Sequence, residues 1–399
     1  MFTNFFEYNL TARDIQVQSE ELANFHSEFA HYFHSKNKNV AKVAHEYLQG
    51  QLLTHGRRNM NKMAAQVSKI NEQSLSHFIG KSSWEEKPIL TAIREKAVAM
   101  IGSSGRHKAL LIDESGFPKQ GKKSVGVARQ YCGCLGKVDN CQVGVFLAYT
   151  NEQHTMLIDK KLYLPAQWVD DPDRCKAAGI PETEICFRTK AQLALEMILH
   201  ARSDNIPFEF VAMDGFYGEQ PKLLNDLETN HIEYMADIPC NTRVFLQFPT
   251  LALPQRRGSR GRRPTRLKIV DGKPKEVQHL LGSDLLRWHH HKIRDIQRGE
   301  LWVQFAAIRV YRSDDQMPHF PPVWLLIRKE LDGSDVKYTF SNASVYESWQ
   351  TLCEKQSTRY WVERALEDAK GIAGMDEYQV ISWRAWHHHI TMVLLAMLA

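Results

Sequence analysis

Two aspartates, Asp113 and Asp214, occupy matching places in the chain. Each ends a short apolar run and precedes a glycine-containing turn, in the sequences IDESGF and MDGFYG. An acid at the carboxyl end of a buried strand emerges at the edge of the sheet, where α/β proteins generally bind their ligands. If the two strands are neighbours, the carboxylates approach each other, and their repulsion is costly unless a cation lies between them. From spacing alone, two ordinary turn acids that cap backbone amides are the slightly favoured interpretation.

Divalent cations would give such a pair of acids a chemical purpose. Mg²⁺ prefers carboxylate oxygens and retains waters at the positions where substrate phosphates bind. Two such ions about 4 Å apart activate an attacking oxygen and stabilise the leaving oxygen in phosphoryl transfer. This chemistry needs a third carboxylate from elsewhere in the chain.

The segment RYWVERALEDAKG offers three further acids, Glu363, Glu367 and Asp368. Glu363 follows Arg359 by four residues and precedes Lys370 by seven, so that these three side chains share roughly one face of a helix. A carboxylate between two cations suits a helix that binds metal and DNA phosphates. An exposed helix with i,i+4 salt bridges is the common alternative, and Glu367, one turn further along, is the rival acid.

Basic residues gather in two places, although the net charge is only +5. The stretch Arg256–Lys268 reads RRGSRGRRPTRLK and contains no acid, which suits a phosphate backbone but also a solvated surface loop. A second group follows Gly50, where a turn and helix start could meet DNA phosphates and where a helical bundle with a charged face is the commoner explanation. The DNA-binding candidates in these stretches are Arg57, Arg58, Lys62, Arg256, Arg257, Arg260, Arg262 and Arg263.

Hydrophobic periodicity predicts how these residues are positioned. Residues 1–100 carry apolar positions at three and four spacing, which predicts an N-terminal helical domain. The basic group after Gly50 is the reason to expect that this domain binds DNA. In residues 101–238, apolar runs alternate with helical segments, which predicts an α/β architecture with a mixed sheet and flanking helices. The strands expected there are Ala109–Ile112, Val125–Tyr131, Cys141–Tyr149, Met156–Leu164, Phe208–Met213 and Ile232–Ala236.

The remainder of the chain changes character twice. Residues 239–341 predict a β-rich, basic insertion, with strands at Leu301–Tyr311 and Val323–Arg328. Residues 342–399 then return to the catalytic core as helices. These are expected at Val345–Cys353, Thr358–Ala369 and Trp383–Leu398, and the second of them carries the third acid.

The bulk composition excludes several classes of protein. With 43% hydrophobic and 24% charged residues among 399, the chain has the composition of a folded soluble protein. No apolar stretch approaches the roughly 18 residues of a membrane span, and the N-terminus lacks a signal-peptide pattern. Seven cysteines without framework spacing fit a reducing compartment, so that we expect a cytoplasmic protein without a membrane partner. No nucleotide-binding motif is present, which argues against ATP use.

Three blocks of this sequence resemble those of a group of bacterial insertion-sequence transposases, the DDE superfamily endonucleases. The first block is LLIDESGFPKQGKKSVGVARQYCGCLGKVDNCQVGVFLAY (Leu110–Tyr149), and the second is VAMDGFYGEQPKLLNDL (Val211–Leu227). The third is RYWVERALEDAKGIAGMDEYQVISWRAWHHHI (Arg359–Ile390), where the family's acid lies in an Ile/Val-Glu pair seven residues before a lysine. That spacing selects Glu363 over Glu367.

The resemblance implies a ribonuclease H-like core in which Asp113, Asp214 and Glu363 are catalytic and hold two Mg²⁺ ions, for which Mn²⁺ can substitute. It implies a cut-and-paste transposase that acts on double-stranded DNA, both transposon ends and target, as a dimer on that DNA. Water first attacks the scissile phosphate, and the freed 3′-hydroxyl then attacks the opposite strand or the target. Further DNA contacts are expected from Lys119, Lys122, Arg359 and Lys370.

Two positions depart from the family pattern. Glu114 stands beside Asp113, where relatives often carry other small polar residues, and we expect it to act on the site only indirectly. Gln356 stands seven residues before Glu363, where the family has a tyrosine. A catalytically silent DNA-binding repressor and a ribonuclease H-like repair nuclease are the alternative functions, and the presence of all three acids argues against the first.

Histidine and cysteine clusters suggest metal sites less strongly. His289–His291 and His387–His389 are consecutive residues, which point in different directions on a helix and cannot all bind one ion. Cys132 and Cys134 lack the second pair that a structural zinc site needs. From the resemblance, we expect the histidines to pack or to contact phosphate, and the cysteines to lie in a strand and turn.

Overall fold

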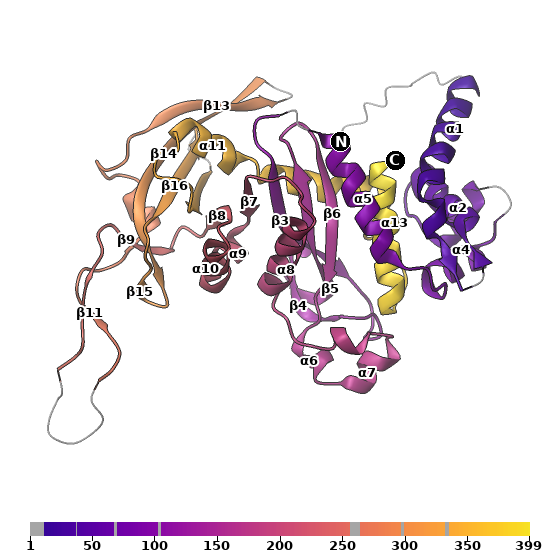
Figure 1. Cartoon of the computed structure of the whole chain (residues 1–399), viewed down its shortest axis with the longest axis horizontal. Helices are drawn as coiled ribbons and strands as arrows, with labels where there is room; N and C mark the ends of the chain where they lie inside the picture. Colours follow the sequence, from indigo (N-terminus) through magenta and orange to yellow (C-terminus); the bar gives the residue numbers. More distant parts are fainter. Residues whose placement is uncertain are drawn as a thin grey trace.

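The computed structural model describes residues 12–36, 38–67, 70–102, 105–255, 264–296, 299–331 and 335–399. Its N-terminal part is helical, as the periodicity predicts (Figure 1). Asn59 and Asn71 begin two of the helices, because each side chain accepts a hydrogen bond from a first-turn amide. The aromatic rings of Phe33, Phe78 and Trp84 pack against one another in the core of this part. The helices are α1 (Ala12–Phe29), α2 (Ala41–Leu53), α3 (Met60–Gln66), α4 (Glu72–Gly80) and α5 (Glu86–Ile101), with a short hairpin of β1 (His34–Ser35) and β2 (Lys38–Asn39).

A mixed sheet forms the centre of the molecule. Its strands are β3 (Ala109–Pro118), β4 (Ala128–Cys132), β5 (Lys137–Thr150), β6 (Thr155–Leu162), β7 (Phe210–Met213) and β8 (Glu233–Ile238). Strand β5 pairs antiparallel with both β3 and β6, whereas β7 runs parallel to β3 and β8 runs parallel to β7. The order β6-β5-β3-β7-β8 is the ribonuclease H-like arrangement that the resemblance implies. The continuous apolar runs follow from burial, since every residue of β7 is buried.

Helices flank this sheet, so that the predicted fold class is confirmed. The connection from β6 to β7 contains α6 (Ala166–Val169), α7 (Pro172–Ala177) and α8 (Lys190–Ser203), and β7 and β8 are joined through α9 (Gly215–Gly218) and α10 (Pro221–Thr229). The C-terminal helices are α11 (Trp349–Ser357), α12 (Tyr360–Ala373) and α13 (Trp383–Leu398). Helix α12 packs on β3 and β6, and α13 lies against α5, between the sheet and the other N-terminal helices (Figure 1).

The β-rich stretch after β8 continues the same sheet. Strand β17 pairs antiparallel with β8, and the sheet runs on through β16, β14, β9 and β12. The strands of this stretch are β9 (Arg243–Phe245), β10 (Thr250–Ala252), β11 (Lys268–Asp271), β12 (Lys275–Glu276), β13 (His289–Ile296), β14 (Gly299–Asp314), β15 (Met317–Pro318), β16 (Val323–Glu330) and β17 (Val336–Ser341). Strands β10 and β11 form a separate two-stranded arm that projects from the body in Figure 1.

Some element bounds differ from the sequence expectation. The strand expected at Val125–Tyr131 begins only at Ala128, because Gly126 adopts a φ of +72° that interrupts an extended strand. The helix expected at Val345–Cys353 begins at Trp349, where the Ser348 side chain accepts a hydrogen bond from a first-turn amide. None of the helices in the described ranges is long and apolar enough to cross a membrane.

Candidate active site

Asp113 and Asp214 lie on neighbouring parallel strands. Ile112 of β3 pairs with Met213 of β7, and each of these residues directly precedes one of the aspartates. Asp214 begins α9 and accepts hydrogen bonds from the backbone amides of Phe216 and Tyr217, at 3.1 and 3.4 Å. Asp113 accepts one from the Glu114 amide at 2.7 Å. Asp214 therefore caps backbone amides in a turn, as the simpler interpretation predicts, whereas β3 continues through Asp113 to Pro118, so that Asp113 is not a turn residue. The strand pairing brings the two acids to one place.

Because Asp113 and Asp214 lie close together in a buried place, ionising their carboxyl groups costs more free energy than it does in water. Burial and the nearby Asp214 carboxylate raise the pKa of Asp113 from 3.8 to about 7, and Glu363 adds to the rise, whereas Arg359 opposes it. Burial also raises the pKa of Asp214. Negative charge at this edge of the sheet is therefore stabilised only where a cation is close.

Helix α12 brings both a third carboxylate and a cation to the two aspartates. The Arg359 guanidinium lies with one terminal nitrogen 2.5 Å from Glu363 Oε1 and the other 3.9 Å from Asp113 Oδ2. Burial disfavours the charged guanidinium, but the surrounding carboxylates raise the pKa of Arg359 above its ordinary value. The rival acid Glu367 instead pairs with Arg364 at 3.5 Å and is 70% exposed. Among the acids of α12, the geometry therefore favours Glu363.

A fourth carboxylate, Asp237, belongs to the same cluster and was missed in the sequence. Asp237 lies near the end of β8, and its Oδ2 is 2.9 Å from Nε of Arg359. A signal was present, because Asp237 follows the apolar strand Ile232–Ala236 just as Asp113 and Asp214 follow theirs. What identifies the pattern as a site is the parallel pairing of β8 with β7.

Glu114 lies beside this cluster, whereas two of the predicted DNA-binding lysines, Lys119 and Lys370, lie further along the chain, just after the end of β3 and within α12. Lys190 Nζ donates to Glu114 Oε1 at 2.8 Å, so that Glu114 is bound to α8. Lys119 Nζ lies 3.5 Å from the centre of the Tyr378 ring and donates to the Tyr378 carbonyl, and burial lowers its pKa to about 8. Lys370 is half-buried in the last turn of α12.

The other DNA-binding candidates are not all exposed. Arg57, Lys62 and Lys122 are exposed, whereas Arg58 pairs with Glu377 and donates to the carbonyls at the end of α12. Arg58 is therefore part of the contact between the N-terminal helices and α12. Arg256, Arg257, Arg260, Arg262 and Arg263 lie outside the described residues.

The histidine triplets take part in packing. His387, His388 and His389 are all buried in α13, and His388 stacks on Trp84 with ring centres 3.6 Å apart. His289 belongs to a strand, β13, and stacks on Trp349. Cys132 ends β4 and Cys134 lies in the turn that follows it, as expected.

Across the described ranges, no group of three or more His, Cys, Asp or Glu side chains is arranged so that it could hold a metal ion without rearrangement. The physical reason at the acid cluster is that Arg359 lies between Asp113 and Glu363. The side chains of the cluster nevertheless fit a hard divalent cation, because they are carboxylates. One guanidinium compensates only part of the repulsion between them, since the pKa of Asp113 remains raised. A metal would require Glu363, which is 47% exposed, to turn from Arg359 towards Asp113.

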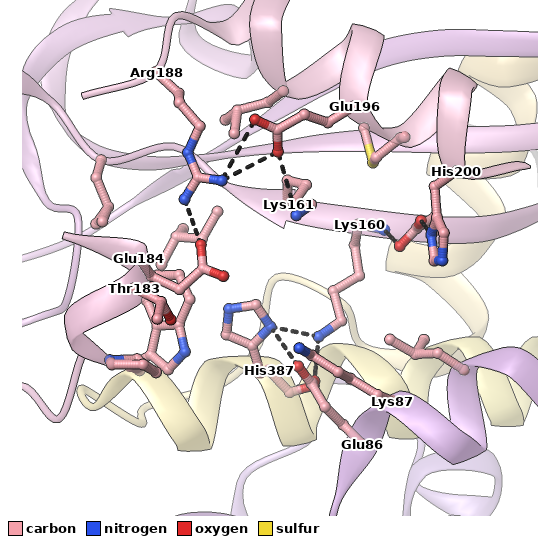
Figure 2. Close-up of a pocket in the computed structure, with 18 of the residues that line it drawn as sticks. Glu86, Lys87, Lys160, Lys161, Thr183, Glu184, Arg188, Glu196, His200 and His387 are labelled. Carbon is pink, nitrogen blue, oxygen red and sulfur yellow. Dashed lines mark hydrogen bonds and ion pairs between the residues drawn. The ribbon is translucent and has the colours of Figure 1, made fainter. Parts of the chain in front are cut away.

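A separate cavity of about 580 Å³ lies between α5, β6, α8 and α13 (Figure 2). Several of its charged side chains are paired with one another, as in Lys161 with Glu196 and Arg188 with Glu184. Asp113, Asp214 and Glu363 do not line it. The cavity is therefore distinct from the acid cluster.

Comparison with known proteins assigns the chain to a family. A family model described as DDE superfamily endonuclease matches residues 28–300, so that the chain belongs to this family. The chain is 29% identical over 214 residues to the "Probable transposase for insertion sequence element IS701" of Microchaete diplosiphon. That match covers 52% of this chain and 53% of the relative, so that it spans about half the length of each. The NurA nuclease from Sulfolobus solfataricus has 10% identity and a TM-score of 0.29, over 70% of this chain and 86% of that one, a likeness too weak to support an argument.

Proposed function

We propose that the protein is a transposase that cuts insertion-sequence ends and joins them to a target by two-metal phosphoryl transfer. The observation that carries the proposal is the convergence of Asp113, Asp214 and Glu363, from three distant segments, around one guanidinium. The matched family segment includes both aspartates and ends before Glu363, so the third acid is proposed from the geometry of α12 and from the sequence spacing.

In this proposal, the three carboxylates hold two Mg²⁺ ions, which Mn²⁺ can replace. The metal ions supply positive charge that activates the attacking oxygen and stabilises the leaving one. Asp113 and Asp214 are fixed by β3, β7 and their amide hydrogen bonds, so that they provide the rigid side of the site. In this proposal, the Glu363 side chain turns from Arg359 to the metal ions when they bind. Without metal ions, Arg359 balances the negative charge of the acids.

The substrate and the assembly on DNA follow from the same proposal. Double-stranded DNA would lie along the acid cluster, with Lys122 and Lys370 close to phosphates, and two copies would assemble on a pair of ends. The four-part division at residues 100, 238 and 341, the DNA-binding role of the N-terminal helices and the cytoplasmic location remain predictions from the sequence. The curated relative supports the proposal through its name as a probable transposase.

The test is cleavage of a labelled duplex that carries the ends of the encoding element. Wild type in Mg²⁺ should cut at the ends, and Glu363→Gln should bind the duplex without cutting it. Glu367→Gln is the matched control, because the same change is made one helical turn away at a side chain paired with Arg364. Asp113→Asn should behave like Glu363→Gln, and near-normal cutting by either variant would refute the assignment.

Two outcomes would support the alternative functions. End-specific binding without cutting by wild type would favour a DNA-binding repressor. Metal-dependent cutting that ignores the end sequence would favour a repair nuclease with the same core. A scrambled-end duplex of equal length distinguishes these outcomes from transposition.

A further inference from the structure

A chain of polar contacts connects the buried side chain of Gln356 with the Nε atom of Arg359, through Thr339 and Asp237. Gln356 Nε2 donates to Thr339 Oγ1 at 2.8 Å, and Thr339 Oγ1 donates to Asp237 Oδ1 at 2.6 Å. The other oxygen of Asp237 lies 2.9 Å from Nε of Arg359. These residues come from α11, β17, β8 and the start of α12, so that the contacts connect four elements.

The direction of each hydrogen bond is determined by chemistry. A carboxylate only accepts, so Thr339 must donate its single hydroxyl proton to Asp237. Thr339 can then only accept from its other neighbour, which requires the amide nitrogen of Gln356 to face it. Thr339 is fully buried and Gln356 is 5% exposed, so water does not readily replace either partner. Gln356 is also the position where the family pattern led us to expect a tyrosine.

The contact with Asp237 determines how Arg359 presents its charge. The guanidinium is planar and carries its N–H groups in a fixed fork, so holding Nε fixes where the two terminal nitrogens point. In this orientation one terminal nitrogen lies at Glu363 and the other faces Asp113. Without the Asp237 contact, the long arginine side chain is free to follow Glu363 towards solvent.

We infer that Asp237 is a positioning residue that holds Arg359 in place at the acid cluster, and that Thr339 and Gln356 hold Asp237. This inference rests on the proposed function for its effect on cleavage, but the arrangement itself belongs to the metal-free protein. If metal ions took the place of the guanidinium beside Glu363 and Asp113, the contact with Asp237 would still keep Arg359 at the site. The two terminal nitrogens of Arg359 are then available to an anionic phosphate oxygen.

Near-isosteric variants test each contact separately. Asp237→Asn keeps an acceptor for Thr339 but removes the charge that faces Arg359. Thr339→Val removes the hydroxyl, and Thr339→Ser restores it. Gln356→Glu replaces the donor by an acceptor and competes for the Thr339 proton. Asp226→Asn, on α10 and paired with Lys222, is the matched control for the loss of an aspartate.

The first readout needs neither metal nor activity. In ¹⁵N-labelled protein with EDTA, the Nε–H of Arg359 should give a resolved, slowly exchanging signal, which Arg359→Lys identifies by its disappearance. Asp237→Asn should shift this signal and speed its exchange with water, whereas Asp226→Asn should leave it unchanged. Thr339→Val should change it in the same direction, and Thr339→Ser should restore it.

The second readout separates cleavage from binding. Under single-turnover conditions, Asp237→Asn and Thr339→Val should lower the cleavage rate constant about tenfold to hundredfold, the effect of losing a hydrogen bond to a charged group. The fraction of active protein and the affinity for the ends should remain those of wild type. A general loss of folding would lower the active fraction instead, and Thr339→Ser should recover the rate.

The outcomes decide the inference independently of the proposed function. An unchanged Arg359 signal in Asp237→Asn, or a wild-type rate constant in that variant, overturns the positioning role. If wild type cuts no DNA, the proposed function fails, and the metal-free signal still decides whether Asp237 positions Arg359. If Thr339→Val does not fold, Gln356→Glu and Asp237→Asn carry the test.

Discussion

Replacing Lys160 by methionine is expected to destabilise the protein by about 3 kcal/mol, because it removes the cation of a buried ion pair beneath α13. The Lys160 side chain is fully buried and pairs with Glu86 of α5 (Figure 2). It also donates to Nδ1 and to the carbonyl of His387, at 2.7 and 3.1 Å. Burial alone would raise the pKa of Glu86, but His387 and Lys160 hold that pKa well below its ordinary value. Removing the lysine therefore takes away one of the two partners that keep the Glu86 carboxylate ionised in its buried position.

The magnitude follows from how much water can reach the remaining charge. Removing one partner of a buried ion pair costs roughly 3–5 kcal/mol, and Glu86 is 20% exposed, which places the cost near the lower limit. Replacing both partners, in Glu86→Gln with Lys160→Met, also removes the carboxylate charge that the lysine neutralised. The double variant should therefore be more stable than the sum of the two single effects predicts, by about 1–3 kcal/mol.

The assay is equilibrium urea unfolding of wild type, both single variants and the double variant at pH 7.5. The metal-free Arg359 signal and end cleavage serve as controls, because this cavity is distinct from the acid cluster. A loss below about 1 kcal/mol in Lys160→Met, or single effects that simply add, would refute the electrostatic reasoning.

Three further predictions concern other parts of the molecule. Gly218→Ala should lower both the stability and the cleavage rate, because an added Cβ would overlap the carbonyl oxygen of Asp237. Normal cleavage by this variant would show that the close approach of Gly218 to Asp237 is dispensable. Arg57→Ala should weaken DNA binding and reduce the salt dependence of that binding by about one charge, as measured by filter binding. Arg58→Ala should instead lower the melting temperature in calorimetry, because it breaks the ion pair with Glu377. Burial lowers the pKa of His389 from 6.5 to about 4, so its contribution to stability is full above pH 6.5 and is lost as the pH falls towards 4. His389→Gln should therefore lose about 2 kcal/mol less than wild type between pH 7.5 and 5, and equal losses would contradict this assignment.

Local patterns in the sequence were sufficient for the elements that carry the acids. The apolar runs before Asp113 and Asp214 predict two buried strands with acids at their ends. Both strands are present, and β7 ends before Asp214, but β3 continues past Asp113 to Pro118 because it stays paired with β5. The helix expected at Trp383–Leu398 has those bounds, because Ser382 caps it and nearly all of its residues are buried. Such features depend on neighbours within a few residues, so that periodicity and capping residues reveal them.

Contacts between residues far apart in the sequence determine which side chains are exposed, how the sheet is extended and which acids meet. No local pattern distinguishes Arg57, which is exposed, from Arg58, which is bound to Glu377 more than 300 residues away. Nor does one show that β17 pairs with β8 and so extends the core sheet, or that Asp237 joins the other acids. The sequence determined which residues could act as acids and cations at a phosphoryl-transfer site. Only the tertiary structure decided which of them meet, because the pairing of strands and the packing of α12 bring together side chains that no spacing along the chain connects.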